Sequence, residues 1–280
     1  MSLSGVDGSV GDERQRLEAA RRDVLQRIEG ACARVRRQPG SVTLVAVSKT
    51  VDADRLVQAV AAGLTRLGEN RVQEALVKAP GVPGVDWELV GPLQSNKARR
   101  AVETFARIQT VDSMDLARRL DLLAAEVRPG QRYPVLLQVN VDDDPAKAGF
   151  QPGDLELALP ELLDVAKLDV EGLMTVGRMV TAPEAARPTF VALRELSARL
   201  RARWPALGGE LSMGMSDDFE IAIEEGATIV RVGRALFGER AAARPSRWCG
   251  QRGLRGLCCS SAGRLNGWPA RSSPISSSSC

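Results

Sequence analysis

The stretch Val42-Thr43-Leu44-Val45-Ala46-Val47-Ser48-Lys49 has the pattern of a buried strand that ends in an amine. Its nearly unbroken apolar run is typical of a parallel strand covered on both faces. Ligands bind where such strands end, and a partly desolvated lysine there can act as a nucleophile toward an aldehyde. Alternatively, Lys49 is only the first exposed residue after the strand, and the rest of the chain must decide between the two interpretations.

Beyond this strand, apolar segments alternate with amphipathic segments of helical spacing. An opening helix is expected over Asp12–Arg36. The eight expected strands are Val42–Val47, a short strand ending at Gly68-Glu69-Asn70, Trp87–Val90, Arg107–Val111, Val135–Val141, Gly172–Val176, Glu210–Met213 and Thr228–Val232. Eight strands alternating with helices over roughly 240 residues match the length of a (β/α)8 barrel. The sequence therefore predicts a single α/β TIM barrel over residues 12–240.

A doubly wound open sheet is the alternative arrangement for alternating strands and helices. Such sheets bind dinucleotides at a glycine-rich first turn, which lets the backbone approach a pyrophosphate. The corresponding turn here, Val47-Ser48-Lys49-Thr50-Val51, contains no glycine. The barrel is therefore favoured, and no second domain is expected before the last forty residues.

The composition excludes several classes of chemistry. The chain contains no histidine, which rules out Ser-His-Asp and Cys-His catalysis and imidazole metal sites. The first residues are polar, and no stretch is long enough to span a membrane, so we expect a cytoplasmic protein without membrane partners.

Residues 241–280 differ from the rest of the chain in charge and cysteine content. They hold six arginines and no acid, so residues 1–240 carry a net charge of −3 against +3 overall, and no nucleic-acid partner is expected. Four of the five cysteines also lie there, and only Cys32 lies in the main body, which argues against a disulfide framework. We predict a disordered Arg/Ser/Gly/Cys-rich tail; a basic binding tail and a reading-frame artefact are the alternatives.

Polar residues and glycines recur where the expected strands stop. Because the carboxyl ends of barrel strands share one face, these residues are expected to surround a ligand. They are Lys49, Asn70, Gln94–Lys97, Asn140, Met174-Thr175, Ser212–Ser216 and Arg231–Arg234.

The last two groups suggest a phosphate site, which in these barrels commonly uses the loops after strands seven and eight. Arg231 faces the same side as Gly233 and needs a partner there, either a ligand atom or a neighbouring acid. Asp217 and Asp218 would repel a phosphate unless they point away. Ordinary loop chemistry is the alternative, but an amine, a phosphate cradle and an arginine together resemble a pyridoxal phosphate site.

Five motifs in order make the resemblance specific: Ala46-Val47-Ser48-Lys49-Thr50, Gly68–Glu74, Gly91–Lys97, Leu211–Asp218 and Val230–Gly233. Together they closely resemble the pyridoxal phosphate homeostasis proteins. The resemblance implies a barrel like the N-terminal domain of alanine racemase. It also implies pyridoxal 5'-phosphate bound as an imine on Lys49. The other implied positions are Asn70 near the ring, the phosphate near Ser212, Gly233 and Arg234, Arg231 facing the pyridine nitrogen, and Lys147 in cofactor handling.

Three positions depart from the family pattern. Glu88 stands where the family often has histidine, Val51 where a second lysine often follows the first, and Arg234 where serine or threonine is common. At the last position only the backbone donor carries over.

The function implied by the resemblance is pyridoxal phosphate homeostasis without robust catalysis, by a monomer whose partners are the cofactor and pyridoxal-phosphate-dependent apoenzymes. An amino-acid racemase is the alternative, but racemisation needs a base on each face of the ring. The chain's one tyrosine, Tyr133, is expected at the opposite end of the barrel. A Schiff-base aldolase using Lys49 on a sugar phosphate is a third hypothesis, although no acid–base pair is evident near the first strand.

Overall fold

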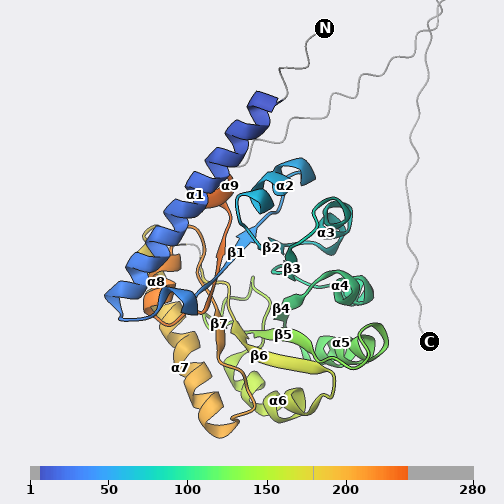
Figure 1. The fold of residues 1–280 in the computed structure, drawn as a ribbon. Helices are drawn as coiled ribbons and strands as arrows, with labels where there is room; N and C mark the ends of the chain where they lie inside the picture. The colour runs from blue at the N-terminus through green and yellow to red at the C-terminus, as the bar shows by residue number, and fades with distance from the viewer. Residues whose placement is uncertain (1–6, 179, 239–280) are drawn as a thin grey trace, which may run out of the picture. The chain divides into compact units, whose positions relative to one another are not determined.

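The computed structural model describes residues 7–178 and 180–238. They form a closed barrel of eight parallel strands in chain order, with the helices outside (Figure 1). The strands are β1 (Thr43–Val47), β2 (Arg66–Glu69), β3 (Asp86–Leu89), β4 (Arg107–Val111), β5 (Tyr133–Gln138), β6 (Leu168–Met174), β7 (Glu210–Ser212) and β8 (Ile229–Val232). The predicted TIM barrel is confirmed. The tail predicted over residues 241–280 lies outside the described residues.

A helix follows each strand, and the helices after β1 and β4 begin at side-chain caps. Asp52 accepts a hydrogen bond from the Arg55 amide at 2.8 Å, which fixes the start of the helix after β1. A long first helix lies along the barrel beside α2, α8 and α9 (Figure 1). The helices are α1 (Asp7–Arg34), α2 (Ala53–Ala61), α3 (Val72–Lys78), α4 (Ala98–Thr104), α5 (Met114–Val127), α6 (Pro152–Asp164), α7 (Arg187–Arg203), α8 (Phe219–Glu224) and α9 (Arg234–Phe237), with four short 3-10 turns between them.

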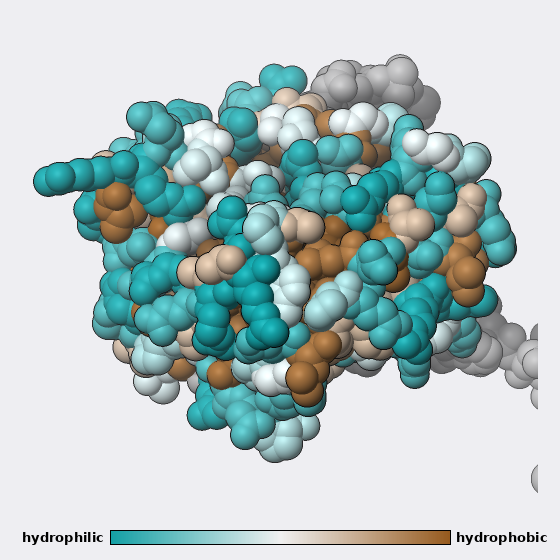
Figure 2. All heavy atoms as spheres, turned by 90° about the horizontal axis from the view of Figure 1, so that it is seen from below, coloured by the Kyte–Doolittle hydropathy of each residue, from teal (hydrophilic) through white to brown (hydrophobic). Residues whose placement is uncertain are grey.

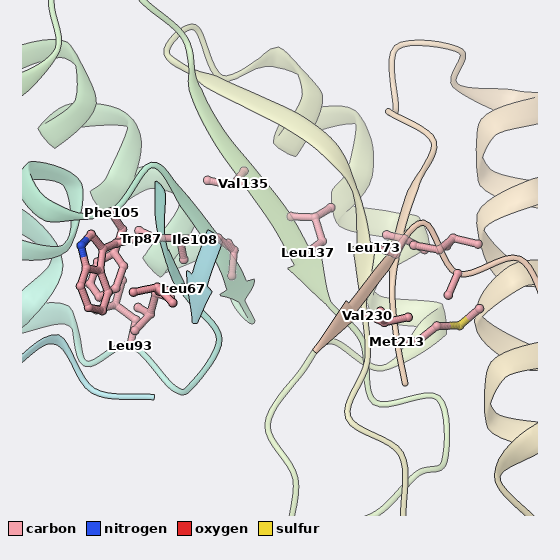
Figure 3. Packing of buried hydrophobic residues seen from close by; sticks show 14 of the residues in the cluster. Leu67, Trp87, Leu93, Phe105, Ile108, Val135, Leu137, Leu173, Met213 and Val230 are labelled. Atoms are coloured by element: carbon pink, nitrogen blue, oxygen red, sulfur yellow. The ribbon is translucent and has the colours of Figure 1, made fainter. Parts of the chain in front are cut away.

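Two hydrophobic clusters follow from the strand alternation. The larger one fills the layer between strands and helices, and Figure 3 shows part of it, including Trp87 from β3 and Leu137 from β5. The smaller cluster draws side chains from four strands around the ring and from the residue directly after β3, and these can meet only inside the barrel. Its fully or nearly buried members are Val45, Val90, Leu136, Met174 and Ile229. The outer surface is mainly hydrophilic on the face drawn in Figure 2, with some hydrophobic side chains gathered near its middle.

The predicted ends of β5 and β6 were wrong. β5 begins earlier, at Tyr133, because it pairs there with Leu168 at the start of β6. It also ends earlier, at Gln138, because the following loop folds back: Phe150 donates its amide to the Gln138 carbonyl at 2.8 Å. Tyr133 is buried at the N-terminal end of its strand and donates to the Phe105 carbonyl at 2.9 Å, so its predicted distance from the strand carboxyl ends is confirmed.

Among residues 7–178 and 180–238, no helix combines the length and the apolar character that crossing a bilayer requires.

Candidate functional site

Lys49 follows β1 in a turn of unusual backbone conformation. Val45 and Val47 pack with the cluster inside the barrel, and Lys49 follows two residues after the end of β1, where the carboxyl ends of the strands meet. Its side chain is only partly exposed. The next residue, Thr50, has a φ of 67°, a left-handed conformation that is unfavourable for a β-branched residue. The turn therefore places Lys49 at the mouth of the barrel, next to a residue of strained backbone conformation.

A buried polar cluster lies behind this turn, between the barrel wall and α3. Glu69, at the end of β2, accepts hydrogen bonds at 2.7 Å from both the Ser48 hydroxyl and the Lys78 ammonium. The Lys78 ammonium also donates to the Ser48 carbonyl at 3.0 Å. Our sequence analysis missed Lys78, although it continues the i, i+3 spacing of the buried Val72 and Ala75 on α3 and so was readable as an inward position.

Arg231, on β8, is buried inside the barrel. Its two terminal nitrogens donate to the Ser212 hydroxyl at 2.6 Å and to the Thr175 carbonyl at 2.7 Å. Burial lowers the pKa of Arg231 to about 10, and the nearby Asp218 opposes that shift. The side chain therefore stays charged at neutral pH, and the structure supplies protein partners for part of its hydrogen-bonding capacity.

The Arg231 contacts continue as a polar chain across the barrel interior. Ser212 donates to Gln109 Oε1 at 2.6 Å, and Gln109 Nε2 donates to Glu88 at 2.6 Å. Since Ser212 is on β7 and Gln109 on β4, strands that are not neighbours, this bond must cross the interior. Glu88 also accepts from Arg66 at 3.0 Å. The acid at position 88, a departure from the family pattern, is thus matched by a basic partner of this chain.

The loop after β7 is folded onto the start of α9. Gly214 has a φ of 90°, and a Cβ there would lie 2.5 Å from the Ala222 Cβ, so only glycine fits. Beyond it, the Ser216 hydroxyl accepts from the amides of Gly233 at 3.2 Å and Ala235 at 3.4 Å. Ser216 therefore marks the backbone donors that we expected to hold a phosphate. The sequence placed Ser216 in the Ser212–Ser216 group at the strand ends but gave it no role of its own.

The two acids of this loop have partners of their own. Asp218 accepts from the Met215 amide at 2.7 Å, and its burial raises the pKa of its carboxyl. Asp217 is exposed and forms an ion pair with Arg234, so the Arg234 charge is engaged with an acid on the preceding loop. Both carboxylates therefore have partners within the protein, which reduces their repulsion of a phosphate bound nearby.

The remaining predicted residues occupy neighbouring strand ends. Asn70 directly follows β2, and the end of β3 approaches so closely that a Cβ on Gly91 would lie 2.4 Å from the Asn70 carbonyl oxygen. Lys147 lies in the loop after β5, within 3.9 Å of Asp142 and 3.7 Å of Asp144. Val51 is buried in the larger hydrophobic cluster rather than at the mouth.

The strand register relates these groups to one another. Val45 on β1 pairs with Arg231 on β8, so Lys49 and Arg231 belong to adjacent strands, and Gly233 lies beside Val47. The donor set comprises an amine, a buried guanidinium and backbone N–H groups at Gly233 and Ala235. These fit an aldehyde, an acceptor ring nitrogen and a phosphate, the three functional groups of pyridoxal phosphate.

Comparison with known proteins agrees with this chemistry. Residues 24–241 match the family model "Alanine racemase, N-terminal domain". The pyridoxal phosphate homeostasis protein of Escherichia coli K12 is 39% identical over 228 residues, covering 78% of this chain and 94% of that protein. That of Pseudomonas aeruginosa is 42% identical over 222 residues, covering 78% and 93%.

Solved structures extend the comparison to the fold. PipY of Synechococcus elongatus, solved with PLP bound, is 42% identical with a TM-score of 0.67, covering 75% of this chain and all of that one. Alanine racemase of Clostridium difficile shares only 15% identity, with a TM-score of 0.59 over 79% of this chain and 61% of its own, so it supports the fold alone. On the strength of the first two relatives and the matching model, this chain belongs to the pyridoxal phosphate homeostasis protein family.

Proposed function

We propose that this protein binds pyridoxal 5'-phosphate at the carboxyl ends of its barrel strands and takes part in cellular homeostasis of the cofactor. The observation that carries the proposal is the pairing of β1 with β8, which brings the Lys49 turn and the buried Arg231 to one mouth. The Lys49 amine would hold the cofactor aldehyde as an imine. Asn70 would lie near the ring.

The phosphate would lie at the start of α9. There the Gly233 and Ala235 amides gather on Ser216, and Gly233 leaves room for close approach of the backbone. Arg234 would contribute its backbone amide. Ser212 would act through Arg231, because its hydroxyl accepts from that guanidinium and donates to Gln109.

The Arg231 guanidinium favours holding the cofactor over catalysis. When bound, pyridoxal phosphate supplies an electron sink, and the sink is strongest with a protonated ring nitrogen. An arginine has donors only, so Arg231 would keep that nitrogen an acceptor. The racemase alternative also lacks its second base: the chain's one tyrosine, Tyr133, is buried at the N-terminal end of β5.

The proposal includes delivery of the cofactor to pyridoxal-phosphate-dependent apoenzymes by a cytoplasmic monomer. It confines the function to residues 12–240, because every group named above lies there. A chain ending at Arg240 should therefore bind pyridoxal phosphate with an unchanged Kd, and a large loss of affinity on this deletion would assign residues 241–280 to the function.

The decisive experiment uses the visible absorption of the loaded protein. Wild-type protein should show a band that borohydride fixes onto Lys49, as mapped by peptide mass. Lys49→Ala should lose both the band and the reducible adduct while keeping its fold. Lys167→Ala is the matched control, because Lys167 precedes β6 at the opposite end of the barrel. A reducible adduct that persists in Lys49→Ala would refute the assignment.

A further inference from the structure

We propose that Lys78, with Glu69 and Glu74, forms a clamp that positions Lys49, so that these three residues set how firmly the cofactor is held. The inference rests on the proposed function in one respect, the use of Lys49 to hold pyridoxal phosphate. The three residues are positioning residues, because they contact the turn that carries Lys49 rather than the cofactor itself.

The clamp holds the backbone on both sides of Lys49. On the N-terminal side, the Lys78 ammonium donates to the Ser48 carbonyl at 3.0 Å. On the C-terminal side, the Thr50 amide donates to Glu74 Oε2 at 3.4 Å. Lys78 and Glu74 both lie on α3, one helical turn apart, and their charged groups are 3.7 Å from each other. One helix therefore fixes the residue before Lys49 and the residue after it.

The clamp also explains the strained conformation of Thr50. A threonine with a φ of 67° persists only where its surroundings over-determine it. The Ser48 hydroxyl adds a third contact, at 2.7 Å to Glu69, so the turn is held through a side chain as well as through its backbone. Loss of these contacts would free the turn to relax and to move the Lys49 side chain from its place at the mouth.

The burial of the Lys78–Glu69 ion pair indicates that the pair fixes a conformation rather than adding stability. Lys78 is 8% exposed and Glu69 is fully buried, and residues of these types are rarely so buried unless paired. Desolvation of a buried ion pair offsets much of its attraction, so such pairs are better explained by the conformation they specify. Oε2 of Glu69 is in addition buried without a hydrogen-bond partner among the described residues, so the carboxylate keeps acceptor capacity beyond Ser48 and Lys78.

The placement also assigns different roles to the two lysines. Ser48 and Glu69 alternate with the inward-facing Val47 and Gly68, so the Lys78 ammonium lies behind the barrel wall, held by the Ser48 carbonyl and Glu69. Lys49 faces the mouth. Lys78 is therefore not a second attachment point, and no reducible adduct should form on it even in Lys49→Ala.

The test compares cofactor binding with folding. The double variant Lys78→Met/Glu69→Gln removes both charges of the pair together, so no buried charge is left alone. We expect its Kd for pyridoxal phosphate to rise about tenfold, the loss of roughly one charge-assisted hydrogen bond. The fraction of Lys49 that borohydride fixes at subsaturating cofactor should fall in parallel. The single variant Lys78→Arg, which keeps the charge and the donors, should keep most of the wild-type affinity.

Two further variants keep the test decisive. Arg128→Met removes a cation that holds the carbonyls of Val102 and Phe105 at the other end of the barrel, each at 2.9 Å, so it should lower Tm and leave Kd unchanged. Glu74→Ala removes the acceptor of the Thr50 amide from a half-exposed position, so it should fold and raise Kd about threefold.

If Glu74→Ala and the double variant both fold, bind pyridoxal phosphate with the wild-type Kd and give the wild-type adduct yield, the clamp is overturned. Wild-type protein that takes up no reducible pyridoxal phosphate would instead overturn the proposed function, whatever Lys78 does.

Discussion

Two polar groups lie near Lys49 and Arg231, one behind the ends of β1 and β2 and the other inside the barrel, and they are built differently. The group behind the wall, which we call the outer cluster, consists of Ser48, Glu69 and Lys78, all within thirty-one residues of chain. The group inside the barrel, which we call the inner chain, consists of Arg231, Ser212, Gln109 and Glu88 with Arg66. It links β2, β3, β4, β7 and β8.

The barrel therefore holds Lys49 and Arg231, the two side chains expected to contact the cofactor, through separate sets of contacts. The outer cluster fixes one turn through local contacts, and Glu69 Oε2 accepts no hydrogen bond from the residues that the structure describes. In the inner chain, each of the central members Ser212, Gln109 and Glu88 has at least two partners, so one lost member leaves polar groups without a partner on two strands. The inner chain should therefore affect global stability most, and the outer cluster should affect the Lys49 turn most.

The largest effect is expected from Glu88→Leu in the inner chain. The substitution leaves the Gln109 amide and the guanidinium of Arg66 without their acceptor, and Arg107 loses an ion partner 3.7 Å away. Breaking a buried charge pair from one side costs about 3–5 kcal/mol. Arg66 keeps Asp86 and Arg107 keeps Glu171 as ion partners, so urea denaturation should show a loss at the lower end of that range.

The control for this prediction is Glu88→Gln, which keeps an acceptor for Gln109 and should cost markedly less. Equal losses in the two variants would mean that the Glu88 charge is not what the basic neighbours require, and the inner chain would then have no electrostatic anchor at its Glu88 end.

A smaller loss is expected from Ser212→Ala, in the middle of the inner chain. It leaves Gln109 Oε1 and a terminal nitrogen of Arg231 unpaired, at a cost of about 1–3 kcal/mol in unfolding free energy. Because Arg231 would also lose its orientation, cofactor affinity should fall. Urea denaturation and absorption titration measure the two effects, and unchanged stability would show that water replaces the hydroxyl without cost.

The independence of the two groups is testable by double-mutant cycles. Gln109→Leu and Ser212→Ala share a hydrogen bond, so their effects on unfolding free energy should deviate from additivity by about 0.5–3 kcal/mol. Glu74 lies 3.7 Å from Lys78 of the outer cluster and has no contact with Gln109 among the described residues, so the effects of Gln109→Leu and Glu74→Ala should add to within about 0.5 kcal/mol. Strong coupling between Gln109→Leu and Glu74→Ala would mean that the outer cluster and the inner chain are one network.

The sequence alone predicted the site residues at the strand ends better than the hydrogen bonds inside the barrel. Lys49 and Asn70 were placed at strand ends because apolar runs stop there, and strand ends in a barrel share one face. The bond from Gln109 to Ser212 could not be read in this way, since it joins residues 103 positions apart on strands that are not neighbours. Only the closed geometry brings them together.

Strand boundaries were predictable where a turn residue stops the run, and not where pairing decides. β4 runs over Arg107–Val111 as predicted, whereas β6 begins at Leu168 because the start of β5 pairs with it. The apolar pattern does not record the length of the partner strand, which explains the error. Tertiary pairing extended β6 beyond what its own sequence indicated.

The smallest effect concerns the outer cluster and is visible only as a pH dependence. Burial raises the pKa of the Glu69 carboxyl, against the opposing hydrogen bonds from Lys78 and Ser48. The folded protein therefore binds the Glu69 proton more readily than the unfolded chain does. This contribution to stability is fully present below the ordinary glutamate pKa of about 4.3 and is lost as pH rises through the elevated value.

Wild-type protein should consequently gain stability relative to Glu69→Gln as pH falls from 7 toward 5, by up to about 1.4 kcal/mol for each unit of pKa elevation. Urea denaturation of the two proteins across this range measures the difference. A difference that is flat or that changes in the opposite direction would mean that Lys78 holds Glu69 ionised throughout. In that case the pair, rather than the burial of the carboxyl, would dominate the electrostatics of the Lys49 turn.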